Sequence, residues 1–269
     1  MLKEISSSDN DKVKLVRRLA SRKGRSEEGL FVAEGINLVS EIIEGGHEIE
    51  FIMVSESFEA GGDDRKAAIA DYMASECCAS YRLKKKIFDK LSDAEHGIEL
   101  IAVCRMNVRG LEFIDSLAED DCILVCDRVQ DPGNMGTMIR TAVAAGYGAL
   151  VLMPGTTDVY SPKVLRATAG MVFAIPILYA KDEDELFDVM QRCARRIVVT
   201  DPAGGVPYYE EDISRGIALV IGNEGAGISE SIMNKADVRV TLPMKGSIES
   251  LNAAVAAAVL MYESVRDRS

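Results

Sequence analysis

Three stretches in the second half of the chain share one layout, and this layout constrains the fold more than any other feature. In each, an apolar run ends in a loop of small and polar residues, and a helical pattern follows. They are residues 127–146 (DRVQDPGNMGTMIRTAVAAG), 221–229 (IGNEGAGIS) and 242–263 (LPMKGSIESLNAAVAAAVLMYE). Ligands of open α/β sheets bind at the carboxyl ends of the strands. Three such loops in one domain therefore predict one composite pocket.

The second half alternates strand and helix patterns throughout. Apolar runs such as IALVI at residues 217–221 are typical of parallel strands that are covered on both faces. We expect strands at residues 123–126, 149–153, 175–179, 196–200, 218–221 and 238–242, and helices at 134–145, 161–169, 184–195, 230–234 and 250–265. This alternation predicts an α/β domain with a doubly wound parallel sheet.

The first half reads as a smaller α/β domain with a mixed or parallel sheet. We expect helices at residues 11–21, 34–44, 66–75 and 84–91, and strands at 30–33, 51–54, 79–83 and 100–103. The pair Gly45 and Gly46 should end the second of these helices. The predicted domains are residues 1–105 and 121–269. The linker of residues 106–120 contains Gly110 and several acidic residues that interrupt the pattern.

Composition excludes several classes of protein. No apolar run reaches the ~18 residues that a membrane helix needs, and the N-terminus lacks the apolar core of a secretory signal. We therefore expect a cytoplasmic protein. None of the six cysteines forms a C-x-x-C pair, and the chain has 2 histidines, so no metal site is expected. Cys104, Cys122 and Cys126 lie in apolar runs and should pack in the core.

Charge is unevenly distributed along the chain. The net charge of −12 argues against a broad, nonspecific nucleic-acid binder, since phosphate contacts require Lys and Arg. Two local stretches are nevertheless basic, residues 12–25 and residues 82–90. Such stretches are either solvated helix faces or a contact surface for one region of an RNA, and the sequence leaves both interpretations open.

The three stretches together resemble a known family. The motifs D-P-x-N-x-G-x-x-x-R-T, G-N-E-G-x-G and P-M-x-G-x-x-x-S-L-N, in this order, resemble the SpoU–TrmH family of RNA ribose 2′-O-methyltransferases within the SPOUT class. The resemblance covers residues 122–266. The first half is similar to the family's RNA-binding substrate domain through residues 29–43. A weaker match covers residues 88–103, where His96 and Gly97 depart from the expected turn.

This resemblance implies several properties of the chain. The C-terminal domain should contain a trefoil knot, and S-adenosylmethionine should be the methyl donor. The partner should be a structured RNA, with ribosomal RNA favoured over transfer RNA. The enzyme should be a homodimer whose active sites borrow residues across the two-fold interface.

The matching motif positions also imply the site residues. The reaction centre is expected to contain Asn134, Arg140, Glu224, Ser250 and Asn252, with the arginine supplied by the neighbouring subunit. The cofactor is expected to contact Thr200, Gly222, Leu242, Pro243, Met244 and Leu251. Methyl transfer to a ribose hydroxyl requires in-line positioning of the donor and loss of the hydroxyl proton. A guanidinium suits the clamping of phosphate or ribose, but with a pKa above ~12 it is a poor base.

Each of these residues also has an ordinary structural explanation. Asn134 and Ser250 stand where helix N-caps are expected. Arg140 would fit a surface salt bridge, Glu224 a solvated loop acid, and the glycines a plain turn. Two other functions stay open, a noncatalytic RNA-binding protein of the same fold and a SPOUT enzyme that methylates a base. The patterns of a dinucleotide-binding glycine loop and of a P-loop are not met.

Overall fold

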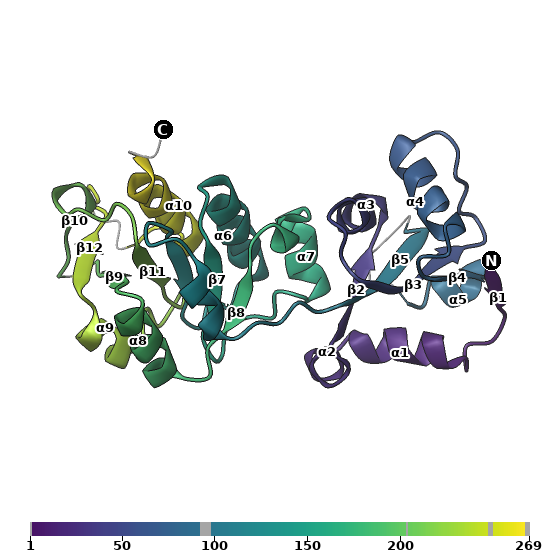
Figure 1. The fold of residues 1–269 in the computed structure, drawn as a ribbon, viewed down its shortest axis with the longest axis horizontal. Helices are drawn as coiled ribbons and strands as arrows, with labels where there is room; N and C mark the ends of the chain where they lie inside the picture. Colours follow the sequence, from purple (N-terminus) through teal and green to yellow (C-terminus); the bar gives the residue numbers. More distant parts are fainter. Residues whose placement is uncertain (1, 92–97, 203, 247–249, 267–269) are drawn as a thin grey trace. The chain divides into compact units, whose positions relative to one another are not determined.

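The computed structural model describes residues 2–91, 98–202, 204–246 and 250–266. The predicted turn at His96 and Gly97 lies outside the described residues. Contacts within the chain divide it into two compact units (Figure 1). Unit 1 comprises residues 1–106 and 160–173, and unit 2 comprises residues 107–159 and 174–269. By its contacts, the segment 160–173 belongs to unit 1 although it lies in the second half of the chain.

Unit 1 is built on a five-stranded sheet in the order β1-β4-β3-β5-β2. Strands β1, β4 and β3 are parallel, whereas β5 runs antiparallel to both β3 and β2, so of the two predicted types, mixed or parallel, the sheet is mixed. The strands are β1 (Lys3–Ile5), β2 (Leu30–Glu34), β3 (Ile49–Ser55), β4 (Ala79–Leu83) and β5 (Leu100–Arg105). The helices are α1 (Asp11–Leu19), α2 (Arg22–Glu28), α3 (Ile36–Glu44), α4 (Asp64–Ala74), α5 (Lys85–Phe88) and α7 (Pro162–Thr168), with the 3₁₀ helix η2 (Met171–Phe173).

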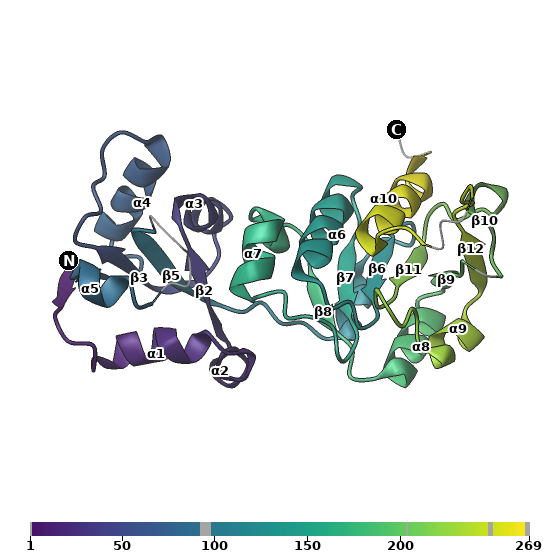
Figure 2. The ribbon, with the colours of Figure 1, turned by 180° about the vertical axis from the view of Figure 1, so that it is seen from behind.

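The two faces of this sheet bury alternate residues of each strand. Phe51 and Met53 of β3 pack in one apolar cluster with residues of α1 and with Phe88 of α5. Helices α3 and α4 lie on the opposite side of the sheet (Figures 1 and 2). Unit 1 is therefore a three-layer domain with α1 and α5 in one helical layer and α3 and α4 in the other.

Helix α2 is an element that the sequence did not predict. Its residues, RKGRSEE, carry no apolar periodicity, because the helix is held by its ends instead. The hydroxyl of Ser21 accepts the amide of Gly24, and Gly29 ends the helix with φ 65°. The buried guanidinium of Arg25 donates to the carbonyls of Leu19 and Ala20, which fastens α2 to the end of α1.

Unit 2 contains a seven-stranded sheet in the order β10-β12-β9-β11-β6-β7-β8, and every pairing in it is parallel. The strands are β6 (Ile123–Cys126), β7 (Ala149–Leu152), β8 (Ile177–Tyr179), β9 (Arg196–Thr200), β10 (Val206–Pro207), β11 (Ile217–Ile221) and β12 (Val238–Thr241). The helices are α6 (Pro132–Ala144), α8 (Glu183–Arg192), α9 (Glu230–Lys235) and α10 (Ala253–Ser264), with the 3₁₀ helices η1 (Leu111–Ser116) and η3 (Tyr208–Glu210).

Helices cover both faces of this sheet. Elements η1, α8 and α9 share one core cluster with alternate strand residues such as Val125, Val199 and Val220. Helices α6 and α10 lie side by side on the opposite face (Figures 1 and 2). The predicted doubly wound parallel sheet is thus confirmed. Within the predicted linker, Leu111 and Ile114 of η1 are buried in the core of unit 2.

The cysteines and the length of the helices can also be compared with what the sequence predicted. Cys104, Cys122 and Cys126 are buried, as predicted, and all six cysteines are free. Burial raises the pKa of the Cys104 and Cys126 thiols well above the ordinary value. Among the helices that the structure describes, none is both long enough and apolar enough to cross a membrane.

Candidate active site

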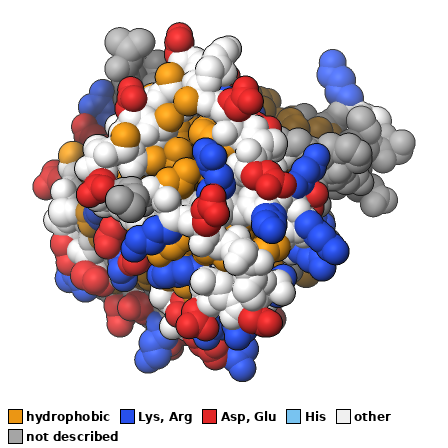
Figure 3. Space-filling model, turned by 90° about the vertical axis from the view of Figure 1, so that its right-hand side faces the viewer, with side chains coloured by type: hydrophobic (Ala, Val, Ile, Leu, Met, Phe, Trp, Pro, Cys, Tyr) orange, Lys and Arg blue, Asp and Glu red, His pale blue; other side chains and the backbone are white. Residues whose placement is uncertain are grey.

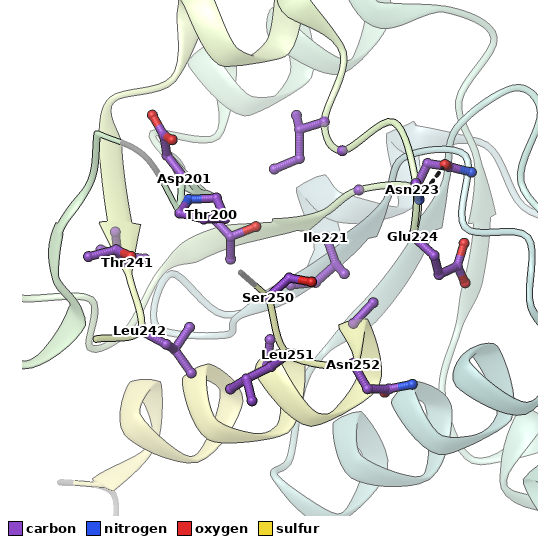
Figure 4. Close-up of a pocket in the computed structure, with 18 of the residues that line it drawn as sticks. Thr200, Asp201, Ile221, Asn223, Glu224, Thr241, Leu242, Ser250, Leu251 and Asn252 are labelled. Carbon is purple, nitrogen blue, oxygen red and sulfur yellow. Dashed lines mark hydrogen bonds between the residues drawn. The ribbon is translucent and has the colours of Figure 1, made fainter. Parts of the chain in front are cut away.

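A cavity of about 580 Å³ opens where strands β9, β11 and β12 end, and its volume is in the range of small-molecule sites. Thr200, Asp201 and Thr241 lie on one side of it, and Asn223 and Glu224 lie on the other, with Ser250 between them (Figure 4). The remaining lining residues are Pro202, Ile221, Gly222, Gly225, Gly227, Ile228, Val240, Leu242, Met244, Leu251, Asn252, Ala253 and Ala256. Two of the three predicted loops, those after β11 and β12, therefore line one pocket together with the end of β9, whereas no residue of the loop after β6 lines it.

The glycine loop after β11 is folded tightly upon itself. The amide of Asn223 donates to the carbonyl of Gly227, and the amide of Gly227 donates back to the carbonyl of Asn223. The side-chain oxygen of Asn223 accepts the amides of Gly225 and Ala226 at 2.9 and 2.8 Å. A Cβ atom on Gly222 would lie 2.4 Å from the Gly227 carbonyl carbon, so the closure of this loop requires glycine at position 222.

The Glu224 carboxylate joins this loop to the loop that follows β6. Its Oε1 accepts the backbone amide of Asp131 at 3.1 Å and the side-chain amide of Asn134 at 3.0 Å. Its Oε2 accepts the backbone amide of Gln130 at 3.1 Å. Both oxygens are thus already engaged by donors of the first loop.

Asn134 extends this network to the third loop. Its Nδ2 donates to Glu224, and its Oδ1 accepts the side-chain amide of Asn252 at 2.8 Å. Asn252 in turn accepts the backbone amides of Ala254 and Val255 through Oδ1. One chain of hydrogen bonds therefore connects Glu224, Asn134 and Asn252, and it links all three sequence motifs.

Neither Asn134 nor Ser250 is the N-cap of the helix that begins near it, so the structural explanation offered for these two residues does not hold. Helix α6 begins at Pro132, and its N-cap is Asp131, whose side chain accepts the amide of Asn134. Helix α10 begins at Ala253, and its N-cap is Asn252. Both capping assignments were therefore wrong by two or three residues. The side chains of Asp131 and Asn252 accept the free amides at the two helix starts and so take the capping role.

The electrostatics of Glu224 follow from these contacts. Partial burial raises the pKa of a carboxyl group, but the hydrogen bonds from Asn134 and from the backbone amides outweigh it, so the pKa of Glu224 falls below its ordinary value. The group is therefore held as a carboxylate that accepts hydrogen bonds.

An ion pair between Asp127 and Arg128 supports the same loops. The buried Asp127 carboxylate accepts Nε of Arg128 at 3.0 Å and the backbone amide of Ser229 at 2.6 Å. Arg128 adopts φ 58°, and its carbonyl accepts the side-chain amide of Asn223 at 2.9 Å. Residues next to β6 and next to β11 are thus fixed together at this strand end.

The residues predicted for the cofactor lie together. Thr200, Gly222, Leu242, Met244 and Leu251 line the cavity, whereas Pro243 does not. Apart from residues of the predicted reaction centre, sequence reasoning did not predict the other lining residues, among them Asp201, Asn223, Ile228 and Ala256. Asp201 follows β9 immediately, so its place after a predicted strand was a signal that could have identified it. Ala256 faces the cavity through helix periodicity, which the alanine-rich run does not reveal.

The five residues predicted for the reaction centre divide into three groups. Glu224, Ser250 and Asn252 line the cavity, and Asn134 lies behind them in the hydrogen-bond chain. The Ser250 side chain makes no hydrogen bond to a described residue. Arg140 does not line the cavity; it is exposed on α6 and has no ion pair or hydrogen bond within the described part of the chain. The structure of one subunit does not bring Arg140 to the site.

The all-parallel α/β domain, with a cavity at its strand ends and the Glu224–Asn134–Asn252 hydrogen-bond chain beside it, carries the three motifs that resemble those of the SPOUT class of methyltransferases. Residues 121–262 match the model of the SpoU rRNA Methylase family, and residues 10–102 match that of the MRM3-like substrate binding domain. The chain belongs to the SpoU rRNA methylase family.

Relatives resemble the chain over nearly its full length. It is 36% identical over 261 residues to the 23S rRNA (guanosine(2553)-2'-O)-methyltransferase RlmP of Bacillus subtilis (strain 168), covering 97% of this chain and 98% of that protein. It is 31% identical to the 23S rRNA (uridine(2479)-2'-O)-methyltransferase of Streptomyces viridochromogenes, covering 93% and 87%. The AdoMet-bound rRNA methyltransferase from Sinorhizobium meliloti superposes with a TM-score of 0.86 at 30% identity, covering 98% of both chains.

We predict that Gly222→Ala abolishes ligand binding at the cavity. The added Cβ would meet the Gly227 carbonyl carbon at 2.4 Å, so the loop must open. Calorimetric titration with S-adenosylmethionine measures the loss. The control is Gly225→Ala in the same loop, where the added atom would meet only Asn223 Oδ1 at 3.7 Å. Equal affinity of the two variants would contradict the role of this close approach.

We also predict that Glu224→Gln removes part of the pH dependence of stability. Because folding lowers the pKa of Glu224, its contribution to the free energy of unfolding is present above the ordinary value of 4.5 and is lost as pH falls through the folded value. Wild type should therefore exceed Glu224→Gln in thermal midpoint at about pH 7 and lose this advantage toward about pH 3. The control is Glu59→Gln, at an exposed loop acid with no ion pair or hydrogen bond to a described residue; an equal loss of the advantage in that variant would contradict the role of Glu224.

Proposed function

We propose that the chain transfers the methyl group of S-adenosylmethionine to a ribose 2′-hydroxyl of ribosomal RNA. The observation that carries this proposal is the hydrogen-bond chain Glu224–Asn134–Asn252 beside a cavity of cofactor size. The relatives that match over nearly the whole chain are named as methyltransferases of the 23S rRNA ribose. We propose a cytoplasmic enzyme with a knotted C-terminal segment on the strength of family membership.

The residues present fit S-adenosylmethionine. The cavity combines apolar walls, formed by Ile221, Leu242 and Leu251, with a glycine loop that brings backbone groups to its surface. When bound, the cofactor supplies an electrophilic methyl group on a sulfonium centre. Thr200, Gly222, Leu242, Met244 and Leu251 would hold it, and Pro243 would act only through the shape of the loop.

The protein's own residues position the reacting hydroxyl. Glu224 has both oxygens occupied by amide donors, so we assign it the role of fixing the loops rather than of taking the proton. Asn134 and Asn252 keep the first and third loops at a constant separation. Ser250 lies at the centre of the cavity with its hydroxyl open to a ligand, and it supplies a hydrogen bond to the ribose.

Arg140 enters the site of a second copy of the chain. Helix α10 exposes an apolar stripe of Val255 (50%), Val259 (36%) and Tyr262 (55%), at the spacing of one helix face. Helix α6 lies beside it and presents Arg140 outward. Association of two copies along α6 and α10 would cover this stripe and carry each Arg140 toward the partner's cavity. There its planar fork would clamp phosphate or ribose.

Base methylation is the alternative reaction within the same class. It calls for an acid–base side chain, such as an aspartate, in the third loop. The described part of that loop offers Ser250 and Asn252 at the cavity, which suits a hydroxyl rather than a base nitrogen. Among the described residues, no group of three or more His, Cys, Asp or Glu is placed to hold a metal ion.

We predict that the purified protein binds S-adenosylmethionine and methylates unmodified 23S ribosomal RNA on ribose. The measurement is transfer of labelled methyl, followed by nucleoside analysis. A 2′-O-methyl nucleoside is the expected product. A methylated base would establish the alternative reaction, and absence of cofactor binding would favour a noncatalytic RNA-binding protein.

We predict that Arg140→Ala keeps cofactor binding and dimerisation but loses most turnover. Mixing this variant with Gly222→Ala should restore activity, because a mixed dimer has one site with an intact cavity and the partner's intact arginine. With random exchange of subunits, about a quarter of the wild-type sites would be active. No recovery on mixing, in a preparation shown to exchange subunits, would place Arg140 in the site of its own subunit or outside the mechanism.

A further inference from the structure

Folding brings the two basic stretches of the sequence onto one helical layer of unit 1. The first stretch lies in helices α1 and α2. The second stretch begins in β4, continues through α5 and ends at Lys90, two positions after α5. The apolar residues of α1 and α5 share one core cluster under the same face of the sheet. Arg17 of α1 and Lys90 line the same small hollow. Stretches about 60 residues apart in sequence are therefore neighbours in space.

Most cations of this layer are not neutralised. Its exposed Lys and Arg side chains without an ion pair to a described residue are Lys14, Arg17, Lys84, Lys85, Lys86 and Lys90. Two ion pairs do occur here, Arg18 with Glu28 at 2.8 Å and Lys23 with Glu27 at 3.7 Å. Arg17 donates only to the backbone carbonyl of Ser8, at 3.4 Å. The surface thus keeps a local excess of positive charge within a chain of net charge −12.

The opposite helical layer of unit 1 has the reverse character. Helices α3 and α4 expose the acids Glu44, Asp64 and Asp71. Lys66 is paired with Glu99 at 2.9 Å, which leaves Arg65 as the exposed cation of α4. Figure 3 views unit 1 from its end; blue Lys and Arg side chains lie across the middle and lower part, with red Asp and Glu side chains among them, and apolar side chains gather above. Charge therefore separates between the two sides of one sheet.

We infer that the layer formed by α1, α2 and α5 is the surface of unit 1 that binds RNA, through the phosphate backbone. This inference rests on the proposed function, because it takes RNA as the substrate. Unneutralised ammonium and guanidinium groups release counterions when they meet phosphates, whereas an acidic layer repels the same backbone. Phosphate contacts orient a nucleic acid without reading its sequence. The layer therefore holds the RNA while the cavity of unit 2 selects the ribose.

The test compares two arginines of the same unit, each exposed and each with one neutral hydrogen-bond partner. Arg17→Gln removes a cation from the basic layer. Arg65→Gln removes one from the acidic layer, where Arg65 donates to Asn37 at 2.8 Å. A third variant, Lys85→Gln with Lys86→Gln, tests the second basic stretch. Binding of deproteinised 23S ribosomal RNA is measured at several salt concentrations, and thermal unfolding confirms that each variant folds.

Arg17→Gln should weaken binding about 5-fold near 0.15 M salt and reduce the salt slope by about 0.9, and the double lysine variant should do more. Arg65→Gln should match wild type. Equal effects of Arg17→Gln and Arg65→Gln, or no RNA binding by wild type, would overturn the inference. Loss of binding to phosphatidylglycerol vesicles with RNA binding unchanged would assign the layer to a membrane and overturn it too.

Cofactor affinity separates this inference from the proposed function. All three variants should bind S-adenosylmethionine as wild type does, because none of the changed residues lines the cavity. If RNA binding depends on Arg17 but no methyl is transferred, the basic layer stands and the proposed activity fails. If the Arg17→Gln and double lysine variants transfer methyl and bind RNA with wild-type affinity, the proposed activity stands and the inference about the basic layer fails.

Discussion

The arrangement of the site depends on the hydrogen bonds that the Glu224 carboxylate accepts. This carboxylate accepts three amide donors from the loop after β6, although it belongs to the loop after β11. A charged acceptor that meets several amides forms stronger hydrogen bonds than a neutral one. Through Asn134 the same interaction reaches Asn252 at the start of α10. This hydrogen-bond chain therefore connects three loops that are far apart in sequence.

The parallel sheet makes this interaction possible. Strands β6 and β11 are paired neighbours and end at the same edge, so Asp127 and Ser229 come within hydrogen-bond distance across more than a hundred residues. Glycine at position 222 then allows the second loop to close against its own backbone. The cavity is consequently a product of strand order, because its walls come from strand ends, the loops that follow them and the start of α10.

Much of this could be read from the sequence. Apolar runs located the strands of unit 2, because a strand buried on both faces tolerates few polar residues. The short edge strands β1 and β10 were not predicted. Helix α2 was not predicted either, because its residues lack apolar periodicity. The caps of α6 and α10 were misplaced, since several adjacent polar residues could serve and the choice depends on the local backbone. Asp201 was not identified, although its place directly after a predicted strand was a signal for it.

The sequence by itself determined the class of fold, the three loops and the residue types at the reaction centre, because each depends on short-range patterns of apolar, glycine and amide residues. Tertiary structure decided which of these residues meet. It turned Glu224 into a bridge between loops, left Arg140 exposed on α6 and outside the lining of its own cavity, and gathered two distant basic stretches on one layer of unit 1. Those outcomes depend on strand order and on which face of a helix is buried, and both are set by long-range packing.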